Sequence, residues 1–176
     1  MSVTGPELFS LLHGMGFGAA FLLTYTGGLE ALWGLDPDGT PRARSSARLR
    51  RLRLAICGMA ALAWLTVLTG LYGLYPWYRA EPLAGADLTG FPRAYLLADP
   101  TLAAWSTFVA DWKAHIACLC PILTTAVAAV VLHYGPRLAD QAQIRHALMA
   151  LLSIAFATAG IAGGLGALLA KVAPIR

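Results

Sequence analysis

Four long apolar stretches dominate this sequence and limit what it can fold into. They run approximately over residues 8–33, 54–77, 102–134 and 146–172. Each reaches the roughly 20 residues that an α-helix needs to cross the hydrocarbon core of a bilayer. Of all residues 58% are hydrophobic and 12% charged, which is far more apolar than a soluble domain. The sequence therefore predicts an all-α integral membrane protein, with residues 1–176 forming a single four-helix transmembrane bundle.

Arginines between the first two stretches predict how the bundle is oriented. Six of them account for most of the formal net charge of +4: Arg42, Arg44, Arg48, Arg50, Arg51 and Arg53. Connections rich in Lys and Arg stay in the cytoplasm under the positive-inside rule. We therefore expect both termini on the outer, periplasmic side of a bacterial inner membrane. We also expect these arginines to contact lipid phosphates and not nucleic acid.

The two remaining connections differ in character. Residues 78–104 would lie outside, and their prolines, glycines and aromatic side chains predict an ordered cover at the membrane interface. A docking surface for a partner protein is the alternative. On the cytoplasmic side, the segment Tyr134-Gly135-Pro136 predicts the end of the third helix.

The histidines are the main candidates for chemistry, because ionisable side chains within a membrane span are costly and usually functional. All four lie in or at the end of a predicted helix: His13, His115, His133 and His146. The predicted topology puts His13 and His115 toward the outer side and the other two toward the cytoplasmic side. His115 and His133 are 18 residues apart, so they share one face of the third helix about 27 Å apart along its axis. This spacing predicts two stacked sites.

Small residues lie beside these histidines on the first and fourth helices. Gly16 is close to His13, while Gly160 and Gly164 continue the helical face of His146. Small side chains let membrane helices approach one another closely, and they also leave room for a flat macrocycle. A histidine at the end of each small-residue stripe favours the macrocycle.

Axial ligation of haem iron needs one nitrogen from each side of the ring, and imidazole is a common ligand. Two pairs meet this requirement, His13 with His115 and His133 with His146. We therefore expect haem b, with two haems preferred to one. The second pair fits less well, because the two residues flank a short connection and His146 lies near the headgroups. Taken singly, each histidine also fits an interfacial residue or one bonded to a backbone carbonyl.

This arrangement resembles the small b-type cytochrome subunits that anchor respiratory oxidoreductases. The resemblance rests on His115 and His133 on one helix and one histidine on each of two others. It departs from the usual plan, in which two helices each give both ligands, because Ala31 stands where the first helix would need an inner ligand. The resemblance implies an electron-transfer subunit of a respiratory or photosynthetic complex. It further implies quinone as a cofactor, other membrane subunits as partners and a c-type cytochrome on the outer side.

Two other functional classes compete with the cytochrome hypothesis. A cofactor-free scaffold or anchor subunit would use its small-residue faces to pack against other subunits. A transporter or channel is disfavoured, because the sequence has no pair of broken helices and no row of intramembrane charges. Asp111 and Lys113 are expected to reach the outer interface or to pair locally, with a proton relay or quinone contact as the alternative. No catalytic constellation is predicted, so independent enzymatic activity is not expected.

Overall fold

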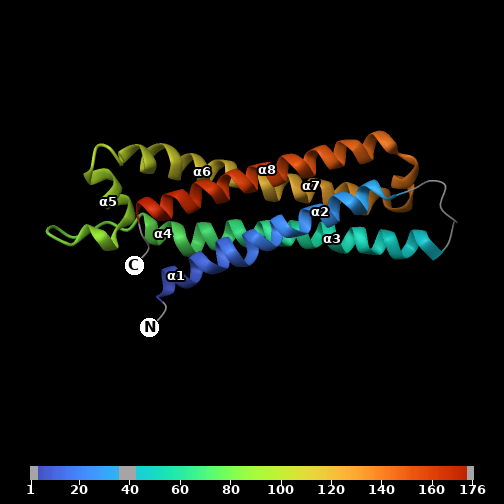
Figure 1. Cartoon of the computed structure of the whole chain (residues 1–176). Coiled ribbons are helices and arrows are strands. Elements are labelled where there is room, and N and C mark those ends of the chain that lie inside the picture. Colours follow the sequence, from blue (N-terminus) through green and yellow to red (C-terminus); the bar gives the residue numbers. More distant parts are fainter. Residues whose placement is uncertain (1–3, 36–42, 174–176) are drawn as a thin grey trace.

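The computed structural model describes residues 4–35 and 43–173, and every regular element within these ranges is a helix. Four helical spans are long and apolar enough to cross a membrane: Gly5–Trp33, Ser46–Tyr78, Trp105–Asp140 and Ala142–Val172. The predicted all-α fold with four membrane-spanning helices is therefore confirmed. The spans run side by side, and the start of α1 lies at the same end of the bundle as the end of α8 (Figure 1).

Three of the four spans are assembled from several helical segments. The first contains α1 (Gly5–Ser10), η1 (Leu11–Gly18) and α2 (Ala19–Trp33). The second contains α3 (Ala43–Leu68), η2 (Thr69–Leu74) and α4 (Tyr75–Tyr78). The third contains η4 (Trp105–Ala110), α6 (Asp111–Ala117) and α7 (Leu119–Tyr134). Segments η1, η2 and η4 are π-helical.

The fourth span is one α-helix, α8 (Ala142–Val172), and a 3₁₀ segment, η5 (Gly135–Asp140), joins it to α7. The long connection after α4 carries a second 3₁₀ turn, η3 (Leu88–Gly90), and a short helix, α5 (Pro92–Ala98). Leu96 in α5 is fully buried, so this connection packs against the spans next to it. At the other end, α7 stops at Gly135, whose φ of +53° favours glycine. The helix end predicted from Tyr134-Gly135-Pro136 is confirmed.

The arginine-rich segment is helical, although the sequence placed it in a connection before residue 54. Helix α3 begins at Ala43 and includes five of the six arginines, while Arg42 lies outside the described residues. Arginine has a high helix propensity. In addition Leu49, Leu52 and Ile56 recur at helical spacing and are buried. Polarity alone suggested a loop there, but the periodic apolar residues extend the helix.

The continuous buried core lies in one half of the bundle, which we call the packed half: α2, α3, α7 and residues 142–158 of α8. Its core is continuous and includes Phe21, Leu32, Leu52, Ile56, Met59, Val127, Val131, Leu148, Leu152 and Ala155. Large apolar side chains such as Leu23 and Leu54, 80% and 68% exposed, cover its outside. A surface this apolar suits lipid, and the chain is a multi-pass membrane protein.

The rest of the bundle, which we call the open half, comprises α1, η1, η2, α4, η4, α6 and residues 160–172 of α8. No side chain of α1, η1, η2, α4 or α6 is buried. All three π-helical segments lie in this half. The same four spans therefore provide a tightly packed end and a loosely packed end.

Candidate functional site

Three π-helical segments lie in the open half, each in a different span. A π segment widens the helix, changes its side-chain register and occurs frequently at functional sites. The backbone approaches closely at Gly18, the last residue of η1, because a Cβ added there would lie 2.9 Å from the backbone oxygen of His13. The apolar pattern of the sequence predicted continuous α-helices here, since a local change of hydrogen-bond register leaves that pattern almost unaltered.

His13 lies in η1, is half-buried and contacts the second span. Its Nδ1 is 2.6 Å from the carbonyl oxygen of Thr66 in the last turn of α3. A carbonyl oxygen only accepts hydrogen bonds, so Nδ1 carries the proton and donates it. The Nε2 atom of the neutral ring therefore keeps its lone pair. The Thr66 carbonyl also accepts a hydrogen bond from Thr69 Oγ1 at 3.0 Å, at the point where the ladder changes from α to π.

Gly70, in η2, leaves the space that the His13 ring occupies. A Cβ added to Gly70 would lie 2.7 Å from His13 Cε1 and 3.0 Å from its Nδ1. These separations are shorter than carbon atoms tolerate, so any other residue would displace the imidazole from Thr66. Sequence reasoning related His13 to the third helix and missed this contact. The glycines of η2 were its only signal.

Lys113 points toward α8 from the third span. Its side chain is half-buried, and Nζ would lie 2.6 Å from a Cβ added to Gly166. The ammonium group is within electrostatic range of His13. Within the described residues it makes no hydrogen bond and no ion pair. The expected local pairing is therefore not seen, and two groups that can carry positive charge, Lys113 and His13, face the open half.

His115 lies two residues after Lys113 but is exposed. Its Nδ1 is 2.7 Å from the carbonyl oxygen of Asp111, one turn earlier in its own helix. Because a carbonyl oxygen only accepts hydrogen bonds, Nδ1 of His115 carries the proton, as it does in His13. Residues two apart in an α-helix are about 200° apart around its axis. Because Lys113 faces α8, His115 faces nearly the opposite way, and the structure does not bring it to His13.

The two remaining histidines lie at the packed end and are both exposed. The His133 ring packs edge-on against Tyr134 at a centroid distance of 5.4 Å. The His146 ring lies 6.4 Å from the ring of Trp33. Across the described ranges no hydrogen bond or ring contact joins His133 to His146, so their role as a ligand pair stays a prediction.

The glycines predicted to border a cofactor are not used to pack this chain's own helices together. A Cβ added to Gly160, Gly163 or Gly164 would meet nothing within 4 Å. A Cβ added to Gly16 would meet only atoms of its own span, the nearest being the Leu11 backbone oxygen at 3.7 Å. Both faces are free to receive a flat cofactor or a helix of another subunit.

A hydrogen bond closes the open half near the long connection. Tyr78 Oη donates to Ser106 Oγ at 3.0 Å, which links α4 to η4. Asp111 and Arg93 lie within electrostatic range of the Tyr78 ring. Sequence reasoning did not identify Ser106, because a single serine in an apolar helix carries no motif.

Among residues 4–35 and 43–173, no three or more His, Cys, Asp or Glu side chains cluster as they would around a bare metal ion. Axial ligation of haem iron would require only one or two nitrogen atoms, and the tautomers of His13 and His115 leave the Nε2 atom of each without a proton. The chain matches no family model, no curated protein and no solved structure. Function must therefore be argued from the geometry of the open half.

Proposed function

We propose that this chain is a haem b-binding electron-transfer subunit of a membrane complex, with the haem held in the open half by His13. The hydrogen bond from His13 Nδ1 to the Thr66 carbonyl carries the proposal. Metal-ligating histidines almost always donate their other ring N–H to a carbonyl, carboxylate or water, which sets the tautomer and the ring orientation. In His13 this bond leaves Nε2 as the ligand atom.

Two other residues of the open half fit the same group. The Lys113 ammonium would pair with a carboxylate of the haem, and the exposed face of Gly16 would leave space for its plane. Gly160 and Gly164 lie about 120° and 200° around α8 from Gly166, which faces Lys113, so their face is turned away from this site. His115 has the required tautomer but faces away, so it would ligate only after α6 rotates or when the haem is shared with a neighbouring subunit. A bound haem supplies one-electron chemistry. The chain supplies ligation and apolar surroundings.

We propose one haem instead of the two favoured by the sequence. His133 and His146 are both exposed, and no contact joins them within the described residues, whereas the core of this half is closed by side chains such as Leu148 and Leu152, which are 2% and 0% exposed. The open half has no comparable core. A second haem on His133 and His146 remains a prediction, which quantitation of haem per chain tests. A quinone nearby also remains a prediction.

The arginines at the start of α3 indicate how the bundle is oriented in the membrane. We propose that the arginine-rich start of α3 faces the cytoplasm of a bacterial cell, as the positive-inside rule indicates. Both ends of the chain and α5 would then face outward. A c-type cytochrome or another outer partner would approach the α5 end, which is also the end nearest His13.

The test is a reduced-minus-oxidised absorption spectrum of the purified protein, made with ample haem, together with haem quantitation per chain. We expect b-type bands at one haem per chain. These bands should be lost in His13→Ala and retained in His133→Ala, which serves as the control because His133 is an exposed histidine outside the proposed site. In His115→Ala, retained haem with altered bands would make His115 the second ligand. Unchanged haem content and spectrum in His13→Ala would refute the assignment.

A second candidate function is a cofactor-free scaffold subunit. The observation that favours it is the unpacked face of Gly160, Gly163 and Gly164, since small residues at this spacing let helices of different subunits approach closely. Colourless protein isolated in a stable complex, from cells with ample haem, would select this function over the cytochrome.

A further inference from the structure

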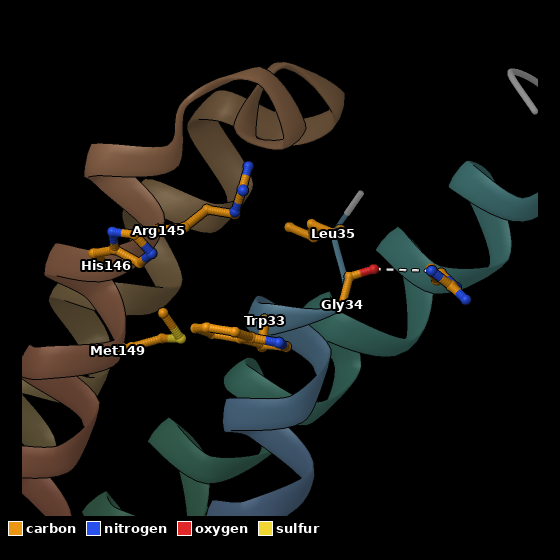
Figure 2. A pocket seen from close by; sticks show the side chains of 7 residues that line it. Trp33, Gly34, Leu35, Arg145, His146 and Met149 are labelled. Carbon is orange, nitrogen blue, oxygen red and sulfur yellow. Dashed lines mark hydrogen bonds between the residues drawn. The ribbon is translucent and has the colours of Figure 1, made fainter. Parts of the chain in front are cut away.

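A second site lies at the packed end of the bundle, between the end of α2 and the start of α8. A cavity of about 440 Å³ lies there, and Figure 2 shows the residues that line it. Its polar side chains belong to Arg48, Arg145 and His146, and its apolar ones include Trp33 and Met149. This site shares no residue with the proposed haem site around His13.

Backbone carbonyls hold both arginines in place. Arg48 Nη1 donates to the Gly34 carbonyl at 2.8 Å, the bond drawn dashed in Figure 2. Arg145 Nη1 donates to the carbonyls of Leu138 (3.1 Å) and Ala139. These acceptors lie at the end of α2 and in η5. Each guanidinium has five N–H donors, so most of them remain available to a ligand.

The cavity lining contains no Asp or Glu among residues 4–35 and 43–173. Among the described residues, neither Arg48 nor Arg145 pairs with a carboxylate. Guanidinium groups bind phosphate through paired, charge-assisted N–H···O bonds. The lining therefore suits a phosphate group.

The surroundings indicate that this phosphate belongs to a lipid. Trp33 is 73% exposed at the mouth of the cavity, the position that tryptophan favours at a membrane–water interface. Farther along the same two helices, Leu23 of α2 and Ile154 of α8 are 80% and 51% exposed. An acyl chain could lie against these apolar surfaces while its headgroup occupies the cavity.

We propose that this cavity binds the phosphate of an anionic phospholipid, held by the guanidinium groups of Arg48 and Arg145. Basic pockets between transmembrane helices bind anionic headgroups in this way. The site would anchor α2 and α8 to the leaflet on the arginine-rich side. His146 then lies at headgroup depth, beside the bound phosphate.

The experiment is native mass spectrometry of the detergent-purified full chain with phosphatidylglycerol, compared with phosphatidylcholine of the same acyl chains. We expect preferential binding of phosphatidylglycerol. Replacing either Arg48 or Arg145 with Gln should weaken the binding of phosphatidylglycerol about fivefold. Replacing both should weaken it about 25-fold. Arg137→Gln is the matched control, because Arg137 is exposed in η5 next to α8 and outside the cavity. An equal loss in Arg137→Gln would overturn the proposal.

A further variant covers the case in which the double variant does not fold. His146→Glu leaves both arginine–carbonyl bonds in place and adds a carboxylate beside the phosphate, so the preference for phosphatidylglycerol should disappear. Retention of the preference would overturn the proposal. Inorganic phosphate at millimolar concentration distinguishes the source of the ligand: failure to displace the lipid supports the lipid site, and displacement assigns the cavity to a soluble phosphate instead.

Discussion

Replacing Gly70 with Ala should destabilise the protein, although alanine is the better helix former. The added Cβ would lie 2.7 Å from His13 Cε1, so the imidazole must move and its bond to the Thr66 carbonyl is lost. Crowding costs about 1–3 kcal/mol, and the hydrogen bond contributes about 1 kcal/mol. The higher helix propensity of alanine stabilises the variant by about 1 kcal/mol. The free energy of unfolding should therefore fall by about 1–3 kcal/mol. The lower end is favoured, because Thr69 still satisfies the Thr66 carbonyl.

The assay is reversible unfolding in mixed micelles with increasing SDS, followed by far-UV circular dichroism. Gly58→Ala is the matched control, because Gly58 lies in the same span and an added Cβ there would meet nothing within 4 Å. This control should be neutral or stabilised by up to about 1 kcal/mol.

A double-mutant cycle then isolates the contact between His13 and Gly70. In a His13→Ala background the ring is gone, so Gly70→Ala should cost nothing and follow Gly58→Ala instead. If Gly70→Ala behaved like Gly58→Ala in the wild-type background, or if its cost persisted without the imidazole, the proposed packing of His13 on η2 would be wrong.

Two further predictions concern the α5 end. Tyr78→Phe removes the hydrogen bond to Ser106 and should lower the free energy of unfolding by about 1 kcal/mol. Tyr72→Phe is the control, because Tyr72 is 74% exposed, and it should change the free energy of unfolding by less than about 0.5 kcal/mol in the same SDS titration. Equal effects of the two substitutions would contradict the hydrogen bond. Thr101 donates to Asp99 through its side chain at 2.7 Å and its backbone N–H at 2.8 Å, and these bonds lower the pKa of Asp99. Their stabilising contribution is thus present above the ordinary aspartate pKa of about 3.9 and is lost as the pH falls through the lower folded-state value. Thr101→Val should raise this pKa in an NMR titration, and an unchanged value would show that the hydroxyl is not a donor.

The four spans could be predicted from the sequence because their signal is long and redundant. Each span has many more apolar residues than it needs, so single exceptions such as Lys113 do not hide it. The boundary before Leu54 was placed too late, because the arginines masked the helical recurrence of Leu49 and Leu52. The end at Gly135 could be predicted because a glycine followed by a proline is a local signal.

The candidate site was only partly predictable, for a different physical reason. His13 stands out by its residue type, but its partner is a backbone carbonyl, and every residue has one. The role of Gly70 depends on how two spans cross, which composition does not encode. For His115 the sequence predicted a face shared with His133, but α6 ends at Ala117 and α7 begins at Leu119, and the direction of the His115 side chain depends on where Lys113 points. Residue types can therefore nominate ligands in a membrane helix, whereas pairing them requires the rotation of each helix.

The division into a packed half and an open half ties these observations together. Membrane helices associate through close packing and not through a hydrophobic driving force, so an extended core in one half must hold the bundle together. Residues such as Leu52, Val127 and Leu152 do this without help from η1, η2 or η4. Because the packed half supplies the stability, the open half can contain π segments, unpacked glycines and the unpaired Lys113 ammonium. These features would weaken a bundle that depended on them, and they are the features that a cofactor or a second subunit needs.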